Sequence, residues 1–189
     1  MILQGIHSLH KLFADSEDVK FQTFSFRNKE STSSSQITFV MGVGLVDGDA
    51  LNSVVYERFV QFFKQRPDEK VKEEEVVQHL YVPGIERIYF EQEAIAGQLL
   101  VYFQTENLFF SINISDRPQR STEETNTEVS IKGPRDNFIE DLTTNIALIR
   151  KRLRTNSLVL KKYTVGKRTQ TEVAVLYMKD IANKQQLKE

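Results

Sequence analysis

Two stretches, FVMGVGLVD at residues 39–47 and VLYMKDIAN at residues 175–183, share one pattern of apolar and turn residues without a gap. Each follows a helical segment, a first strand and a polar loop, and each leads into a further helical segment. The alternative interpretation is that strand–helix units resemble one another because the same physics shapes them all. As a duplication, the pattern predicts an α/β fold of two related small subdomains with mixed sheets, each ordered helix–strand–strand–helix.

The first subdomain is expected over residues 1–114. Apolar spacing predicts a helix at residues 4–13, strands at residues 19–26 and 37–43, and a further helix at residues 76–80. A polar loop at residues 28–36 is expected to join the two strands. Asp49 is the predicted N-cap of a helix that follows the second strand. The buried positions of that helix are expected to be Leu51, Val55, Phe59 and Phe62. Later strands are predicted at residues 85–90, 99–103 and 108–114.

A polar linker is expected at residues 115–136, and the second subdomain at residues 137–189. Asn137 and Glu140 fit a capping box at the start of its helix. The apolar side chains of that helix recur at helical spacing, at Phe138, Leu142, Ile146, Ile149 and Leu153. Strands are predicted at residues 158–165 and 172–178. A helix predicted from residue 183 stops with the chain, so this subdomain is expected to be truncated relative to a longer protein.

Composition excludes several kinds of chemistry. The 189 residues contain no cysteine, which removes disulfides, cysteine-ligated zinc, iron–sulfur clusters and thiol nucleophiles. No apolar run approaches ~18 residues, so the chain itself is not expected to span a membrane. No Ser, His and Asp arrangement with a nucleophile elbow is present. Neither an enzymatic activity nor a cofactor is therefore expected.

Two weaker patterns have more ordinary explanations. Gly42 and Gly44 lie between a strand and a helix, as in a nucleotide-binding turn, but the matching positions of the second copy carry no glycine. His7 and His10 lie three apart on a helix and could share a metal ion, but the sequence places no third ligand near them. Structural roles are favoured for all four residues, and no metal site is expected.

Positive charge is concentrated in the second subdomain. Between residues 142 and 171 there are eight basic residues and no acidic one. One interpretation is that cations favour the C-terminus of a helix. The other is a face for anionic lipid headgroups or an acidic partner, with Arg150, Arg152, Lys161, Lys162, Lys167 and Arg168 as its candidate residues. Nucleic acid is not expected as a partner, because the net charge is −1 and no base-stacking motif appears.

A second candidate site lies at the predicted start of the helix in the second subdomain. Lys132 and Arg135 flank Gly133-Pro134 beside a helix N-terminus, where backbone N–H groups favour anions. The two cations could hold a carboxylate or phosphate of a ligand or partner. They could equally pair inside the chain, with the acidic residues Glu123, Glu124 and Glu128.

Residues 120–183 resemble the N-terminal region of the A subunit of GerA-type spore germinant receptors. The family pattern is an Arg-Ser-x-Glu-Glu-Pro-x-Thr-Glu approach, a Gly-Pro-Arg turn, and a helix reading Glu-x-Leu-x-x-Asn-x-x-Leu-Ile-Arg-x-Arg. This chain differs at Thr125, where proline is usual, and at Lys132, where arginine is usual. The matching residues are Arg120, Ser121, Glu123, Glu124, Thr127, Glu128, Gly133, Pro134, Arg135, Phe138, Leu142, Asn145, Leu148, Ile149, Arg150 and Arg152. Arg120 and Asn145 thereby join the candidate ligand- or partner-binding residues.

The resemblance implies a non-enzymatic receptor component in the inner membrane of a bacterial spore, with this region on the core (cytoplasmic) side. The implied partners are a membrane B subunit and a lipoprotein C subunit. Nutrients such as amino acids or sugars would trigger the complex, and this region would sense them, assemble the complex, or do both. The alternative function is a scaffold that binds an anionic membrane or an acidic partner through the basic residues. A cleft between the two lobes is expected, since such clefts commonly hold small ligands.

Overall fold

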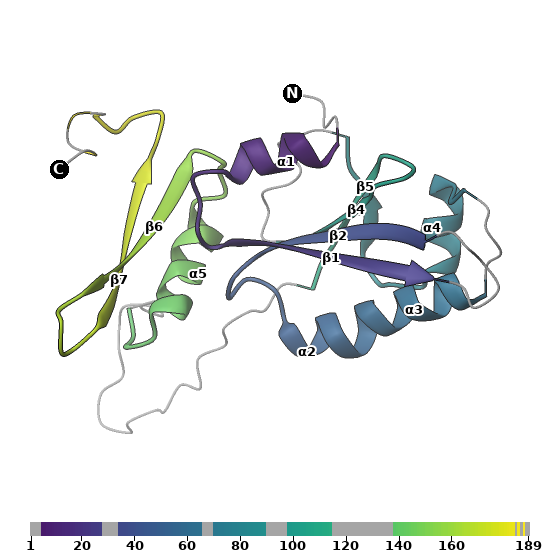
Figure 1. The fold of residues 1–189 in the computed structure, drawn as a ribbon, viewed down its shortest axis with the longest axis horizontal. Coiled ribbons are helices and arrows are strands. Elements are labelled where there is room, and N and C mark those ends of the chain that lie inside the picture. The colour runs from purple at the N-terminus through teal and green to yellow at the C-terminus, as the bar shows by residue number, and fades with distance from the viewer. Residues whose placement is uncertain are drawn as a thin grey trace, which may run out of the picture.

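The computed structural model describes residues 5–27, 34–65, 70–89, 98–114 and 138–183, and also residues 185 and 187. Two sheets and a small set of helices form the structure (Figure 1), which confirms the predicted α/β class. We call the described residues up to 114 the first unit and residues 138–183 the second unit. Their elements in chain order are α1 (Ile6–Phe13), β1 (Val19–Arg27), β2 (Ser34–Gly42), α2 (Gly48–Ala50), η1 (Leu51–Tyr56), α3 (Glu57–Lys64), α4 (Glu73–His79), β3 (Ile85–Arg87), β4 (Leu99–Phe103), β5 (Leu108–Ile112), α5 (Leu142–Arg152), β6 (Leu158–Val165) and β7 (Thr171–Met178).

The first unit is built on a five-stranded sheet with the strand order β1-β2-β4-β5-β3. Every pair of described strands is antiparallel, whereas mixed sheets were expected. For two of these pairs, β1–β2 and β4–β5, the cause is a short connection. Residues 28–33 join β1 to β2 and residues 104–107 join β4 to β5, which is too few for the crossover that a parallel pair needs.

Helices cover both faces of this sheet, with α1 on one side and η1 and α3 on the other (Figure 1). On the α3 side, the ring centroid of the fully buried Phe59 lies 5.2 Å from that of Phe39 and 5.9 Å from that of Phe103. On the α1 side, Leu9 is buried in one cluster with Val40 and Leu100. Because both faces are covered, β4 is buried at every position, which explains its unbroken apolar sequence LLVYF.

The helical segment after β2 starts earlier than predicted. Asp47, and not Asp49, is the N-cap, because its carboxylate accepts hydrogen bonds from the backbone N–H groups of Asp49 and Ala50. Asp47 has the extended backbone that an N-cap requires, whereas Asp49 already lies inside the helix. The predicted apolar positions are confirmed: Val55, Phe59 and Phe62 are buried, and Leu51 packs against them half-buried.

The second unit consists of α5 and the β6–β7 hairpin, which pairs Leu158 with Met178 and Val165 with Thr171. The order helix–strand–strand of α1-β1-β2 therefore recurs in α5-β6-β7. The division into subdomains at residues 1–114 and 137–189 stays a prediction. The predicted linker, and most of the helix predicted from residue 183, lie outside the described residues.

The predicted start of α5 at residue 137 is wrong. The helix begins at Leu142, and Asp141 caps it by accepting a hydrogen bond from the backbone N–H of Thr144. Phe138 therefore precedes the helix and is 67% exposed, while Ile146 and Ala147 form the buried face. The carboxylate of Asp141 satisfies one of the free N–H groups of the first turn, so this position fixes where the helix starts.

We expect α5 to lose stability in acid through Asp141. The pKa of its carboxyl is lowered by a hydrogen bond from the Thr144 side chain and a second from the Thr144 backbone. A lowered folded-state pKa gives stability that is complete above the unfolded value of about 3.9 and is lost as pH falls through the folded value. Wild type should therefore be more stable than Asp141→Asn at pH 6, with the difference shrinking below pH ~4. Urea unfolding at several pH values measures this, and a pH-independent difference would contradict it.

Candidate functional site at the junction of the two units

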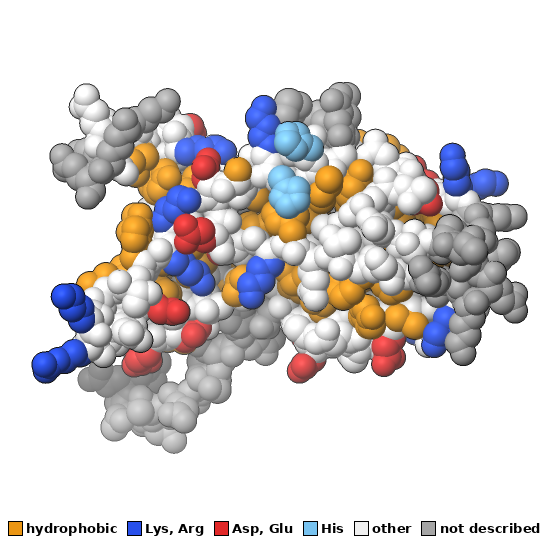
Figure 2. Space-filling view, viewed as in Figure 1, with side chains coloured by type: hydrophobic (Ala, Val, Ile, Leu, Met, Phe, Trp, Pro, Cys, Tyr) orange, Lys and Arg blue, Asp and Glu red, His pale blue; other side chains and the backbone are white. Residues whose placement is uncertain are grey.

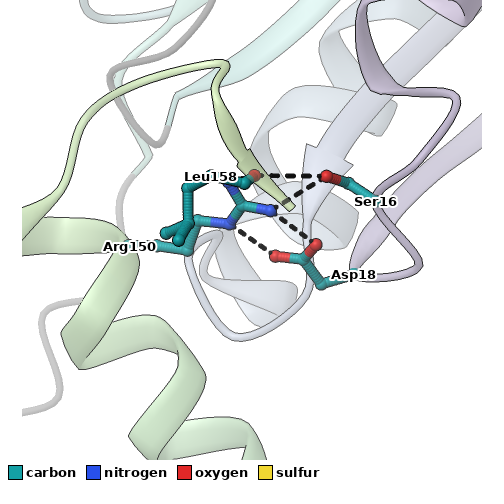
Figure 3. Close-up of polar contacts among 4 residues, drawn as sticks. All are labelled: Ser16, Asp18, Arg150 and Leu158. Atoms are coloured by element: carbon teal, nitrogen blue, oxygen red, sulfur yellow. Dashed lines mark hydrogen bonds and ion pairs between the residues drawn. The ribbon is translucent and has the colours of Figure 1, made fainter. Parts of the chain in front are cut away.

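The two units meet at the loop between α1 and β1, where a buried ion pair joins them (Figure 3). Arg150, on α5, grips Asp18 with two parallel hydrogen bonds, from Nε to Oδ2 and from Nη2 to Oδ1, each 2.8 Å long. Its Nη1 donates to the backbone carbonyl of Leu158 at 2.8 Å, and its Nη2 also donates to the Ser16 hydroxyl at 3.2 Å. The Arg150 guanidinium thus links three elements: the loop between α1 and β1, the helix α5 and the strand β6. We call Asp18 and Arg150 the clamp.

The clamp is shielded from solvent. The side chain of Asp18 is 2% exposed and that of Arg150 is 10% exposed. A carboxylate that loses its water in this way is costly unless a partner satisfies it, and a bidentate guanidinium is the partner with matching geometry. The arrangement fixes both the distance and the orientation between the loop and α5.

Backbone contacts continue the junction along β6. The Glu17 N–H donates to the carbonyl of Leu160 at 3.1 Å, and the Lys162 N–H donates to the Glu17 carboxylate at 2.9 Å. The ammonium of Lys161 lies 3.5 Å from the other oxygen of that carboxylate. The loop therefore forms hydrogen bonds with the edge of β6 that faces away from β7. Fewer backbone N–H and C=O groups of that edge remain unpaired as a result.

A glycine turn forms another part of the junction. Gly44 follows β2 with φ +77, and a Cβ built on it would lie 2.8 Å from Thr143 Cγ2 and 3.5 Å from the Ala147 Cβ. Both residues belong to α5. Gly44 is therefore explained by a left-handed backbone and by close packing against a helix, without a phosphate-binding turn.

We expect Gly44→Ala to destabilise the protein by about 2 kcal/mol, because alanine pays ~1–2 kcal/mol in this backbone region and also crowds Thr143. Gly48→Ala is the matched control, since a Cβ at Gly48 meets nothing within 4 Å. It should be neutral or stabilising by up to ~1 kcal/mol. Urea denaturation of both variants measures the difference, and equal midpoints would refute the packing role of Gly44.

A small hollow lies beside the clamp. Asp18 and Arg150 line it together with mainly apolar residues of both units: Phe13, Val19, Val40, Met41, Gly42, Leu45, Gln98, Leu100, Leu153 and Thr155. Since the two charged groups already satisfy each other, the hollow presents a mostly apolar wall with a few polar atoms. Its volume of about 40 Å³ has room for a few water molecules and is far below the ~300–1,000 Å³ of a typical ligand pocket.

The candidate ligand- or partner-binding residues are only partly placed. Arg120, Glu123, Glu124, Glu128, Lys132 and Arg135 lie outside the described residues. Asn145 is engaged inside the chain: its side-chain oxygen accepts from the Ile139 N–H at 2.8 Å, and its amide donates to the Ile139 carbonyl at 2.6 Å. The side chain thus fastens the segment before α5 in the way a neighbouring strand would. Its role in binding a ligand stays a prediction.

The basic residues do not form one surface. Arg150 points inward to Asp18, so it was wrong to place it on a membrane or partner face. Lys162, Lys167, Arg168 and Arg152 are exposed, and Lys161 is half-buried. On the face shown in Figure 2, acidic side chains are interspersed among the basic ones of the second unit. For His10 a structural role is confirmed, because its ring stacks on that of Phe21 with the centroids 4.1 Å apart.

Asp18 and Ser16 are the junction residues that sequence reasoning missed. Both lie in a polar stretch between a helix and a strand, which is an ordinary loop composition. Asp18 and Arg150 are 132 positions apart, so no local spacing connects them. The available signal was an acidic residue directly before an apolar strand, which is too common to point to a buried pair.

The family assignment comes from comparison with known proteins. The family described as "Bacillus/Clostridium GerA spore germination protein" matches residues 7–189. The spore germination protein XA of Bacillus anthracis is 46% identical over 102 residues, covering 54% of this chain and 20% of that protein. The spore germination protein KA of Bacillus subtilis (strain 168) is 27% identical over 157 residues, covering 77% of this chain and 27% of that protein. The chain thus spans about a fifth to a quarter of these relatives.

A solved structure shares the fold. The N-terminal domain of the A subunit of the Bacillus megaterium spore germinant receptor GerK3 superposes with a TM-score of 0.69, at 19% identity, covering 97% of this chain and 66% of that one. Within the described ranges, none of the helices combines the length and apolarity that a membrane crossing needs. With a family match that runs from residue 7 to residue 189, this chain belongs to the GerA family of spore germination proteins.

Proposed function

We propose that this chain is the N-terminal region of a germinant-receptor A subunit and that it couples a nutrient signal, or the assembly of the receptor, to spore germination. It does so without catalysis. The B and C subunits are its proposed partners, and its proposed place is the core side of the spore inner membrane. The family match over residues 7–189 supports the receptor role.

The clamp is the observation that carries the coupling role. It connects the loop before the central sheet to the helix of the second unit through one buried guanidinium. A movement of α5 therefore displaces the start of β1, because the bidentate contact tolerates little change in angle.

The decisive experiment is removal of the coding region for residues 7–183 in the spore former, followed by germination assays against a panel of amino acids and sugars. Loss of the response to at least one nutrient is expected, with recovery when the intact gene is restored at another locus. Unchanged germination with every nutrient that triggers the parent strain would refute the proposal.

Two further measurements separate sensing from assembly. If the region senses the nutrient, thermal-shift titration of the chain should show stabilisation by about 2.7 kcal/mol at 100 times the dissociation constant. If it assembles the complex, immunoblots of the deletion spores should show depleted B and C subunits. A thermal shift without depletion of the B and C subunits favours sensing. Depletion of these subunits without a thermal shift favours assembly.

A further inference from the structure

One dipeptide of the chain is chemically reactive in a way that the others are not. Asp47-Gly48 is the single place in the sequence where an aspartate or asparagine precedes glycine. The side-chain carbon Cγ of an aspartate can be attacked by the backbone nitrogen of the next residue, and a side chain on that residue hinders the attack. Glycine has no side chain, and a Cβ built on the exposed Gly48 would meet nothing within 4 Å. The Gly48 nitrogen is therefore open to this reaction.

The N-cap of the helical segment at residues 48–64 opposes the reaction. Asp47 Oδ1 accepts hydrogen bonds from the Asp49 N–H at 2.9 Å and the Ala50 N–H at 3.0 Å. The five-membered ring that would form needs Cβ of Asp47 and the Gly48 nitrogen to eclipse each other about the Cα–C bond. The extended ψ of 111° at Asp47 keeps these two atoms well apart. Ring closure therefore requires the cap to open first, as helix ends do in local fluctuations.

Asp47 also connects two parts of the first unit. Its N–H donates to the carbonyl of Ile114, directly after β5, at 2.9 Å, and its carbonyl accepts from the N–H of Leu51, in η1, at 2.9 Å. An isoaspartyl residue runs the backbone through the side-chain carbon, so it adds one methylene between these two contacts. Isomerisation would therefore break the cap and separate the start of the helix from the end of β5. Gly44, which packs against α5, lies in the same turn.

We propose that Asp47 converts spontaneously to isoaspartate in the folded chain and that opening of the N-cap sets the rate. The Gly48 nitrogen forms a bond to Asp47 Cγ, and one carboxyl oxygen leaves as water with the carboxyl proton and the amide hydrogen. Water then opens the resulting succinimide. Opening at Cγ restores aspartate, whereas opening at the backbone carbonyl gives isoaspartate with a free α-carboxylate. The reaction needs no oxidant or reductant, and this inference does not depend on the proposed function.

Peptide mapping of the aged chain tests the proposal. The folded chain is stored in mildly acidic buffer well below its unfolding temperature, sampled over weeks and digested. Liquid chromatography and mass spectrometry with backbone fragmentation then separate isoaspartate from aspartate, which has the same mass. Isoaspartate is expected to accumulate at position 47, preceded by a succinimide peptide that is lighter by one water. Gly48→Ala should abolish this signal, because its methyl group shields the attacking nitrogen.

A pair of matched variants tests whether the N-cap is the gate. Ala50→Gly weakens the first turn of the helix and leaves the dipeptide intact. It should raise the open population, and with it the rate of isoaspartate formation, by about fivefold. Gln61→Gly makes a similar change at an exposed position of α3, and its rate should stay within about twofold of wild type, because distant sites act independently. Circular dichroism confirms that each variant is folded.

Three results would overturn the proposal. Aspartate that persists at position 47 of the folded chain, while the urea-unfolded chain converts, would show that the fold protects it fully. Equal acceleration by Ala50→Gly and Gln61→Gly would assign the reaction to global unfolding and not to the N-cap. Undiminished conversion in Gly48→Ala would show that the open space at Gly48 has no part in the reaction.

Discussion

Arg150→Ala should destabilise the protein by about 3–5 kcal/mol, because it leaves the Asp18 carboxylate buried without its partner. Asp18 is 2% exposed, and both of its carboxylate oxygens accept hydrogen bonds from Arg150. Alanine also removes the donors to Leu158 and Ser16. Urea unfolding at neutral pH measures the loss. A change below ~1 kcal/mol would mean that water reaches the carboxylate and that the clamp is not a buried contact.

Two further variants identify the cause of that loss. Lys151→Ala removes an exposed cation from the next position of the same helix and should change stability by less than ~0.5 kcal/mol. Asp18→Asn/Arg150→Met removes both charges and keeps much of the volume, so it should recover most of the stability that Arg150→Ala loses. If the double variant is as unstable as Arg150→Ala, the loss arises from geometry and not from an orphaned charge.

Phe59→Ala should cost about 3–5 kcal/mol, the range for removing a fully buried aromatic side chain from a core. Phe59 is 0% exposed and lies at the centre of an aromatic cluster, with ring centroids 5.2 Å from Phe39, 5.9 Å from Phe103 and 6.1 Å from Phe26. The neighbours come from three strands and cannot all move into the space. Thermal unfolding followed by circular dichroism checks the result.

The control for Phe59 lies two positions along α3. Gln61 is exposed, so Gln61→Ala should leave the unfolding midpoint nearly unchanged. Phe59→Leu should fall between the two, because leucine refills part of the volume. A loss for Phe59→Ala of less than ~1.5 kcal/mol would show that the cluster collapses around the missing ring.

The sheet strands were predictable because their apolar residues carry a local signal. Leu99–Phe103 is an unbroken apolar run, and it became the central strand that helices cover on both sides. Phe59 and Phe62 were predicted from helical spacing and are buried. In these segments the local apolar pattern agrees with the observed burial, so the pattern alone predicts which side chains are buried.

Helix starts and side-chain roles were less predictable. Asp47 and Asp49 are both capping residue types, and the backbone of the preceding turn decides between them. Arg150 belongs to a run of cations, so its sequence context favours exposure, yet the loop that carries Asp18 buries it. Asn145 matches a family pattern that suggests binding, but its hydrogen bonds go to Ile139. Each outcome depends on a contact that the single sequence does not encode locally.

From the contact between the α1–β1 loop and β6 we also expect an order of folding. A two-stranded hairpin is at best marginally stable in water on its own, and β6 gains a further partner from Glu17, 145 positions before Lys162. During synthesis the N-terminal sheet emerges first and can fold before the later strands exist. The loop then serves as a preformed template on which β6 condenses. Until Arg150 has been synthesised, the Asp18 carboxylate lacks its partner, so we expect the clamp to close late in folding.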